Sequence, residues 1–152
     1  KALQYLDVHA AEVGRQVTRW LRDGIFTDEE KEVLNIADLT AFSKSDLAGR
    51  IAASAEVYRE YPFSVLLDSE IAVLATKGEK ILVQGVIDCL FKEDGKWVIV
   101  DYKTDCLEDE AAFRKRYTIQ LSFYKRAAEQ ISGIEVKEAL IYSSRLYKTI
   151  SI

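Results

Sequence analysis

Two stretches of the chain decide the fold: Gln84-Gly85-Val86-Ile87-Asp88 and Val98-Ile99-Val100-Asp101-Tyr102-Lys103-Thr104. Both are rich in Val and Ile, which favour β-strands. Between them stands Asp94-Gly95, a dipeptide typical of a two-residue hairpin turn. The sequence therefore predicts an antiparallel hairpin with strands at 80–92 and 96–103.

The turn also fixes which residues face each other. With Asp94 and Gly95 at its centre, the hairpin places Asp88 opposite Asp101. Because side chains alternate along a strand, Lys103 shares a face with Asp101, and Cys89 points away from Asp88 into the core. Three ionisable side chains are thus predicted to converge on one patch of the sheet.

Two facing carboxylates repel each other, and a divalent cation would neutralise them. Hard cations such as Mg²⁺ favour carboxylate, carbonyl and water oxygens. A lysine beside them can orient a water molecule or stabilise charge on a phosphate. The ordinary alternative is a solvated strand face on which Lys103 pairs with Asp101. The apolar neighbours argue against it, as does Gly85, which in mid-strand indicates a close approach by backbone or ligand.

A helix predicted over 109–131 and capped by Gly133 supplies a second element of the site. Gln120 and Tyr124 are four residues apart and lie on one helix face, where they can contact a phosphate or hold the lysine. A tyrosine in such a helix is more often a core residue. The basic residues of the same helix are interpreted as a solvated face: Arg114, Lys115, Arg116, Lys125 and Arg126.

Apolar spacing and turn residues predict the remaining elements. Helices are expected over 2–22, from Thr27 to about Ala37, and from Ser45 to a point before Pro62. A strand over 63–75 and a turn at Lys77-Gly78 lead into the hairpin. A last strand over 136–143 and a short edge follow the long helix. The sequence indicates one α/β domain.

Composition excludes several classes of protein. The chain has 152 residues, 49% of them hydrophobic, and a formal net charge of −4. It has no apolar run of the ~18 residues that a membrane span needs, and no signal peptide. Two cysteines, Cys89 and Cys106, cannot form a disulfide framework or a four-cysteine zinc site. Because the chain starts at Lys1 and lacks methionine, we expect a piece of a longer polypeptide.

Three spaced motifs resemble the RecB-like branch of the PD-(D/E)XK nuclease superfamily: Gly85-x-x-Asp88, Asp101-x-Lys103-Thr104 and Gln120-x-x-x-Tyr124. The sequence around them is similar to the C-terminal nuclease domain of AddA-type helicase–nucleases. Residues 59–63 resemble the segment that precedes the sheet in that group. The resemblance implies a restriction-endonuclease-like fold, a central mixed sheet with an antiparallel hairpin flanked by helices. It further implies that residues 1–152 form a single nuclease domain of a larger helicase–nuclease.

The same resemblance implies a Mg²⁺-dependent DNA exonuclease, with Mn²⁺ as a substitute, acting in double-strand break repair by recombination. It assigns catalytic roles to Asp88, Asp101, Lys103, Gln120 and Tyr124. Asp88, Asp101 and the carbonyl of Tyr102 would bind the metal, and Lys103 would position the attacking water. Gln120 and Tyr124 would support the site or the DNA backbone.

Expected partners are DNA, helicase domains of the same polypeptide and an AddB-type subunit, in the cytoplasm and without a membrane. Relatives carry a metal-binding histidine in an N-terminal helix. The only histidine here, His9, lies too far along, and we expect the family histidine before Lys1.

Three other hypotheses stay open. The chain could be an impaired nuclease fold that binds DNA or a partner without cleaving, although Asp88, Asp101 and Lys103 are intact. It could be a stand-alone RecB-like nuclease, but such relatives often hold an iron–sulfur cluster with four cysteines. It could also be a structural domain whose hairpin acids are solvated.

Overall fold

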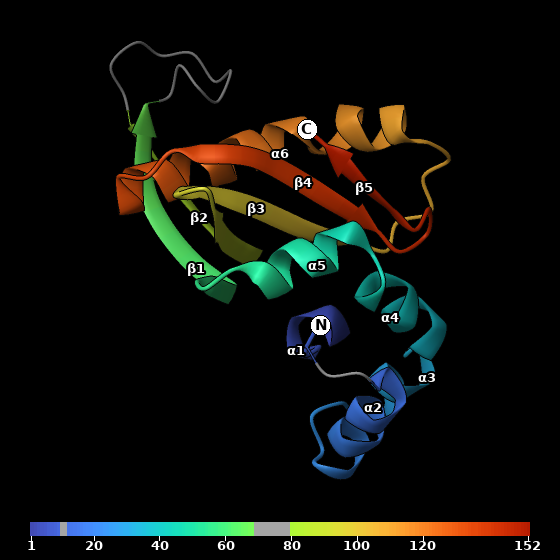
Figure 1. The fold of residues 1–152 in the computed structure, drawn as a ribbon. Helices are drawn as coiled ribbons and strands as arrows, with labels where there is room; N and C mark the ends of the chain where they lie inside the picture. Colours follow the sequence, from blue (N-terminus) through green and yellow to red (C-terminus); the bar gives the residue numbers. More distant parts are fainter. Residues whose placement is uncertain (10–11, 69–79) are drawn as a thin grey trace.

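A five-stranded mixed sheet, in the order β1-β2-β3-β4-β5, is the central layer of the chain (Figure 1). The computed structural model describes residues 1–9, 12–68 and 80–152. The elements are α1 (Ala2–Tyr5), α2 (Val13–Arg22), α3 (Asp28–Glu32), α4 (Ile36–Ser43), α5 (Asp46–Ala53), β1 (Val57–Asp68), β2 (Lys80–Glu93), β3 (Lys96–Lys103), α6 (Glu110–Ser132), β4 (Val136–Ser143) and β5 (Lys148–Ser151). Neighbouring strands are antiparallel except β3 and β4, which are parallel.

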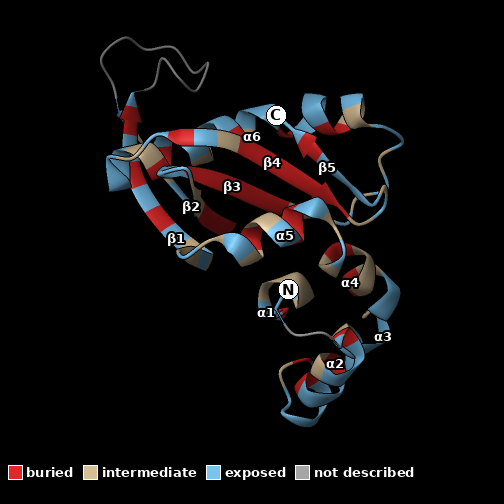
Figure 2. Cartoon of the chain, in the orientation of Figure 1, coloured by how far each residue is buried: buried red, intermediate tan, exposed pale blue. Residues whose placement is uncertain are grey.

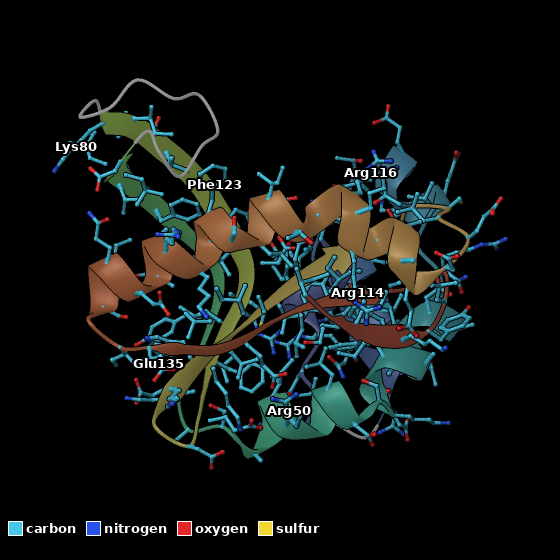
Figure 3. The ribbon with its side chains drawn as sticks, turned by 90° about the horizontal axis from the view of Figure 1, so that it is seen from above. Arg50, Lys80, Arg114, Arg116, Phe123 and Glu135 are labelled. Carbon is cyan, nitrogen blue, oxygen red and sulfur yellow. The ribbon has the colours of Figure 1, made fainter. Side chains whose placement is uncertain are left out.

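Helices cover the two faces of the sheet (Figure 3). One cluster of buried side chains lies on the side of the N-terminal helices and includes Trp20, Phe42, Phe91 and Val100. Another lies on the side of α6 and includes Ile99, Phe113, Leu121 and Ile141. Both clusters draw on β3 and β4, and these strands are accordingly the most buried part of the sheet (Figure 2).

Strands β2, β3 and β4 and helix α6 lie where the sequence predicts them. Asp94 (φ 52°) and Gly95 (φ 76°) form the turn between β2 and β3, with the positive φ angles of a type I′ turn. The paired residues follow the predicted register from Glu93–Lys96 to Cys89–Val100. Gly133, at φ 67°, ends α6 in the left-handed conformation that glycine adopts without strain. The predicted mixed sheet with flanking helices is therefore confirmed.

The single helix predicted over 2–22 is wrong. The helix stops at Tyr5, and Leu6 is extended, with ψ at 118°. Side chains replace the helical hydrogen bonds here: Asp7 accepts from the N–H of His9, and Gln16 bonds both the N–H and the carbonyl of Asp7. Such local bonds compete with a helix, although the apolar spacing continues through them. Residues 10–11, also within that prediction, lie outside the described residues.

The single helix predicted from Thr27 to about Ala37 is wrong, because α3 covers only its first part and α4 begins at Ile36 and runs beyond it to Ser43. Thr27 and Glu30 form the capping box expected at its start. Yet α3 ends at Glu32, and the side chain of Asn35 accepts from the N–H groups of Ala37 and Asp38 to begin α4. An asparagine that caps a new helix thus interrupts the apolar spacing.

The first strand begins at Val57, not at Phe63, so residues 59–63 belong to the sheet instead of preceding it. Pro62 lies inside this strand. It is tolerated because β1 is an edge strand with one neighbour, where a missing N–H need not break a ladder. The predicted strand residues 69–75 and the Lys77-Gly78 turn lie outside the described residues. Within 1–9, 12–68 and 80–152, no helix has both the length and the apolar character of a membrane span.

An ion cluster ties α5 to the hairpin and to β4. Arg50 donates two hydrogen bonds to Glu93, at 2.9 and 2.8 Å, and also pairs with Glu138. Lys137 adds contacts of 2.8 Å to Glu93 and to Asp94. Bonds from Arg50 and Lys137 lower the pKa of Glu93 from 4.5 to about 2.

We expect Glu93→Gln to lower the free energy of unfolding at pH 7 by about 1–2 kcal/mol, allowing for solvent screening of this partly exposed cluster. Since the folded pKa of Glu93 is lowered, its contribution is present above pH 4.5 and is lost as the pH falls towards 2. Urea unfolding of both proteins between pH 7 and 2 tests this. Glu135→Gln, which removes an exposed ion pair with Lys96, is the control and should lower the free energy of unfolding by less than Glu93→Gln does. A difference in the free energy of unfolding between Glu93→Gln and the parent that stays constant down to pH 2 would contradict the expectation.

The two thiols should react at very different rates. Cys89 is fully buried and burial raises its pKa to about 11, whereas Cys106 is exposed. A thiolate must form and reach solvent to react. A disulfide reagent should therefore label one thiol rapidly in the native state, and Cys106→Ser should abolish this fast phase. Rapid labelling that survives Cys106→Ser would show that Cys89 is accessible.

Candidate active site at the end of strand β3

Asp101 is a nearly buried carboxylate in β3, with 2% of its surface exposed. The Nζ of Lys103, two residues along the same strand, lies 2.6 Å from its Oδ2. The two groups form an ion pair, but Oδ2 accepts no well-formed hydrogen bond. A buried carboxylate oxygen without a full set of partners is unusual in a folded protein and calls for an explanation.

Burial is the main influence on Asp101 and raises its pKa. Lys103 opposes this effect, and the nearby carboxylate of Asp88 adds to it. The negative charge of Asp101 is therefore only partly compensated by the lysine. An added cation at this point would favour the ionised form of the carboxylate.

Asp88 lies where the regular hairpin ends. The ladder between β2 and β3 stops at Cys89–Val100, one step before the predicted Asp88–Asp101 pair, so that pair does not form. The same register would place Val86 opposite Lys103 two steps further on, and that pair does not form either. Instead, Oδ2 of Asp88 accepts a hydrogen bond of 2.9 Å from the backbone N–H of Tyr102. The carboxylate of Asp88 thus accepts the hydrogen bond that the backbone carbonyl of a paired strand residue would accept in a regular ladder.

Side-chain alternation also breaks at Asp88. Ile87 belongs to the core on the α6 side, whereas Cys89 belongs to the core on the opposite side. In a regular strand these two residues would share a face. Cys89 is buried as predicted, but the face assigned to Asp88 by simple alternation does not apply at this irregular point. On the other flank, Glu60 stands opposite Asp88 in an interrupted part of the β1–β2 ladder, with a positive φ of 50°.

Helix α6 covers one face of the sheet (Figure 3), and its Tyr117 contacts Lys103. The Nζ of Lys103 lies 4.7 Å from the centre of the Tyr117 ring, a cation–π contact. Burial, and then hydrogen bonding to Asp105, raises the pKa of Tyr117 to about 12. The sequence patterns did not single out Tyr117, although it is seven residues before Tyr124 and so on the same helix face.

Gln120 and Tyr124 lie one turn apart on α6, and their side chains bond to each other. The Nε2 of Gln120 donates to the Oη of Tyr124 at 2.8 Å. The Tyr124 ring packs edge-on against Phe63, with ring centres 5.4 Å apart. Among the described residues, no hydrogen bond or ion pair joins either side chain to Asp101 or Lys103. Their catalytic role therefore stays a prediction.

The close approach at Gly85 is made by aromatic side chains, not by the backbone or ligand that the sequence predicted. A Cβ at Gly85 would lie 2.8 Å from Cζ of Phe63 and 3.5 Å from Cε1 of Tyr124. The missing side chain lets Phe63 and Tyr124 stack over β2. Gly85 thus lets β2, the first strand of the hairpin, pack against the Gln120–Tyr124 pair.

Some of the basic residues of α6 have structural partners. Arg114 donates to the carbonyl of Ser151 at 3.0 Å, and Arg116 lies 3.7 Å from Asp105 (both arginines are labelled in Figure 3). His9 is exposed, in a turn after α1. The ring of Tyr102 packs against Phe42 on the face away from α6, so only its main chain reaches towards Asp88.

The predicted metal ligands suit a hard divalent cation. Mg²⁺ binds through one or two carboxylates and keeps several waters, so Asp88, Asp101 and one carbonyl are a sufficient set. The incompletely bonded Oδ2 of Asp101 is the oxygen that such a cation would take. In residues 1–9, 12–68 and 80–152, no cluster of three or more His, Cys, Asp or Glu side chains is placed to hold a metal ion. A metal here would therefore depend on the carbonyl and on water.

Comparison with known proteins shows the family of the chain. The family model of the PD-(D/E)XK nuclease superfamily matches residues 4–149. The chain is 34% identical to an AddA-type ATP-dependent helicase/nuclease from Clostridium perfringens (strain 13 / Type A), over 99% of this chain and 13% of that protein. It is 33% identical to the protein of the same name from Ruminiclostridium cellulolyticum, over 92% of this chain and 12% of that protein. The chain thus spans about an eighth of the length of these relatives.

We expect Gly85→Ala to lower the free energy of unfolding by about 1–3 kcal/mol, because Phe63 is buried and cannot move aside without disturbing Tyr124. Gly49→Ala is the matched control. It lies inside α5 with nothing within 4 Å of the added Cβ, and should stabilise by about 0.5–1 kcal/mol. Thermal and urea unfolding give both values. If Gly85→Ala is as stable as the parent, the stacking over β2 is not as tight as described.

Proposed function

Because this chain belongs to the PD-(D/E)XK nuclease superfamily, we propose that it hydrolyses DNA phosphodiester bonds as the Mg²⁺-dependent exonuclease domain of an AddA-type helicase–nuclease. The observation that carries the proposal is the buried Asp101–Lys103 pair beside Asp88 at the end of β3. An apolar residue would stabilise the folded chain at this buried position at least as well as a carboxylate, without the loss of hydration free energy. A chemical role for the carboxylate accounts for its retention.

Three residues divide the work in this proposal. Asp88 and Asp101, with the carbonyl of Tyr102, would hold Mg²⁺ or Mn²⁺. When bound, such an ion acidifies water and neutralises charge on the phosphate oxygens. Lys103, directed towards the site by its contact with Asp101, would orient the attacking water and offset the charge that develops on the phosphate.

Helix α6 would form one wall of the site. The Tyr117 ring under the Lys103 ammonium limits the positions that the lysine can take. Gln120 and Tyr124, bonded to each other, present an amide and a hydroxyl from the same helix face. We propose that this pair supports the site or contacts the DNA backbone.

The wider biological role rests on the names of the relatives. They are helicase/nuclease subunits about eight times as long as this chain. We propose that the chain works as a single nuclease domain beside helicase domains in one polypeptide, with an AddB-type partner subunit. Double-strand break repair by recombination, in the cytoplasm, is the process that this arrangement would serve.

Lys103→Ala should separate metal binding from cleavage. We expect it to lower DNA cleavage by about 100-fold or more while leaving the rise in melting temperature on adding Mg²⁺ intact. Asp88→Ala and Asp101→Ala should lose both cleavage and the Mg²⁺-dependent rise. Melting curves with and without Mg²⁺, and digestion of labelled DNA, test this in the chain and in the longest natural polypeptide that contains it.

Asp94→Asn is the control. It removes an acidic group at the other end of the same hairpin, and Asn-Gly suits the type I′ turn equally well. Cleavage at the parent rate by Lys103→Ala would refute the water-positioning role. A parent protein that binds Mg²⁺ and DNA yet never cleaves would favour the impaired nuclease fold instead.

A further inference from the structure

A groove opens at the carboxyl ends of β3 and β4, the parallel strands of the sheet. We call it the strand-end groove, and its lining residues are Val33, Asn35, Asp38, Thr104, Ser144, Arg145 and Tyr147. Its volume is about 440 Å³. Ligands of α/β proteins commonly bind beyond the carboxyl ends of parallel strands. Lys103 ends β3 at this edge, and its carbonyl accepts the N–H of Ser144, so the groove adjoins the candidate active site.

The groove continues into a deeper apolar recess. The recess has a volume of about 160 Å³ and shares five lining residues with the groove. Its other lining residues are mostly apolar: Lys1, Ala2, Leu3, Leu34, Leu39 and Tyr102. An apolar cavity of about 150 Å³ is known to hold one benzene ring. A single flat ring system therefore fits the recess. Val33 is 81% exposed beside it, an apolar side chain that a ring could cover.

Polar groups at the rim have unused hydrogen-bonding capacity. Asn35 caps α4 with its Oδ1 only, which leaves Nδ2 free to donate. Asp38 accepts from the Oη of Tyr147 with Oδ1 at 2.7 Å, and its Oδ2 has no partner among the described residues. The groove thus offers one donor and one strong acceptor a short distance from an apolar recess.

Charge favours a base over a phosphate inside the groove. The carboxylate of Asp38 would repel a phosphate, yet it can accept a hydrogen bond from an exocyclic amino group. Arg145 is exposed at the rim and has no ion-pair partner in the described part of the chain. It can meet a phosphate at the outer edge while the base lies within.

The groove also contains a strained residue. Tyr147 has a φ of 51°, in the left-handed region that bulky residues avoid, and 53% of its surface is exposed. Its bond to Asp38 joins the turn after β4 to α4. Non-glycine residues in this region persist where the surroundings enforce them, often at functional sites. The ring of Tyr147 lines the groove, and its hydroxyl is bonded to Asp38.

We propose that the strand-end groove binds one unpaired base of the DNA, from the nucleotide next to the cleaved phosphate, and prefers bases that carry an exocyclic amino group. The proposal rests on the proposed nuclease function for the identity of its ligand. Lys103 is the last residue of β3, and Thr104, which follows it directly, lines the groove. A strand of DNA that crosses this edge would present its phosphate to Lys103 and its base to the groove.

The test measures binding of eight-nucleotide single-stranded DNA to the Lys103→Ala variant without divalent cations, so that the DNA stays intact during the measurement. An abasic site is placed at each position in turn. We expect one position at which the abasic site weakens binding about 5- to 50-fold, as loss of one stacked base does. Tyr147→Ala should remove that sensitivity, whereas Tyr147→Phe, which keeps the ring, should retain it.

Base preference gives an independent readout. Oligo(dC) should bind at least about fivefold more tightly than oligo(dT), which lacks the amino group, and Asp38→Asn should reduce this ratio. Asp46→Asn is the matched control, since it removes an acidic residue from the first turn of α5, outside the groove. Melting temperatures of all variants verify that they are folded.

The outcomes separate this proposal from the nuclease function. Equal binding at every abasic position, or a dC-to-dT ratio unchanged by Asp38→Asn, overturns the base site and leaves the nuclease proposal standing. A base-dependent site in a protein that cleaves no DNA with any divalent cation overturns the nuclease proposal alone. Failure to bind any oligonucleotide overturns both.

Discussion

The carboxylate of Asp101 lies almost wholly out of water, with the ammonium of Lys103 2.6 Å from its Oδ2. Removing an ion from water costs several kcal/mol, and one lysine in partial contact with solvent does not fully offset this. The structure tolerates that cost because β3 is held on both sides, by β2 and by β4, and covered on both faces. The central position of the strand thus fixes the position of its two charged residues.

The other parts of the site follow from that strand. The hairpin ladder ends one step before Asp101, and the N–H of Tyr102 freed by this ending holds Asp88. On the opposite side, α6 brings Tyr117 under Lys103. Because Gly85 has no side chain, Tyr124 of α6 packs on β2 without a steric clash. A regular hairpin could not have supplied the backbone donor that orients Asp88.

The sequence predicted those parts of the fold that depend on local signals. Asp94-Gly95 determined the hairpin register, and Gly133 marked the end of α6, because each position demands a backbone conformation that few residues adopt. Gln120 and Tyr124 could be paired from helical spacing alone. The family resemblance added the roles of these residues, which geometry by itself does not assign.

The remaining features depend on contacts between distant or competing groups. The helix break at Leu6 arises from Gln16 bonding back to Asp7, a choice that apolar spacing cannot reveal. The irregularity at Asp88 depends on its bond to Tyr102, 14 residues away. Tyr117 was missed because its role comes from lying over Lys103, and only the packing of α6 on the sheet shows this.

The most direct test of the proposed metal site is a crystal structure of the chain with Mn²⁺, using anomalous scattering to locate the metal. We expect one strong peak bonded to carboxylate oxygens of Asp88 and Asp101 and to the carbonyl of Tyr102, with Lys103 beside it. A peak that involves neither carboxylate, or none at saturating Mn²⁺ with Lys103 still on Asp101, would contradict the proposed site.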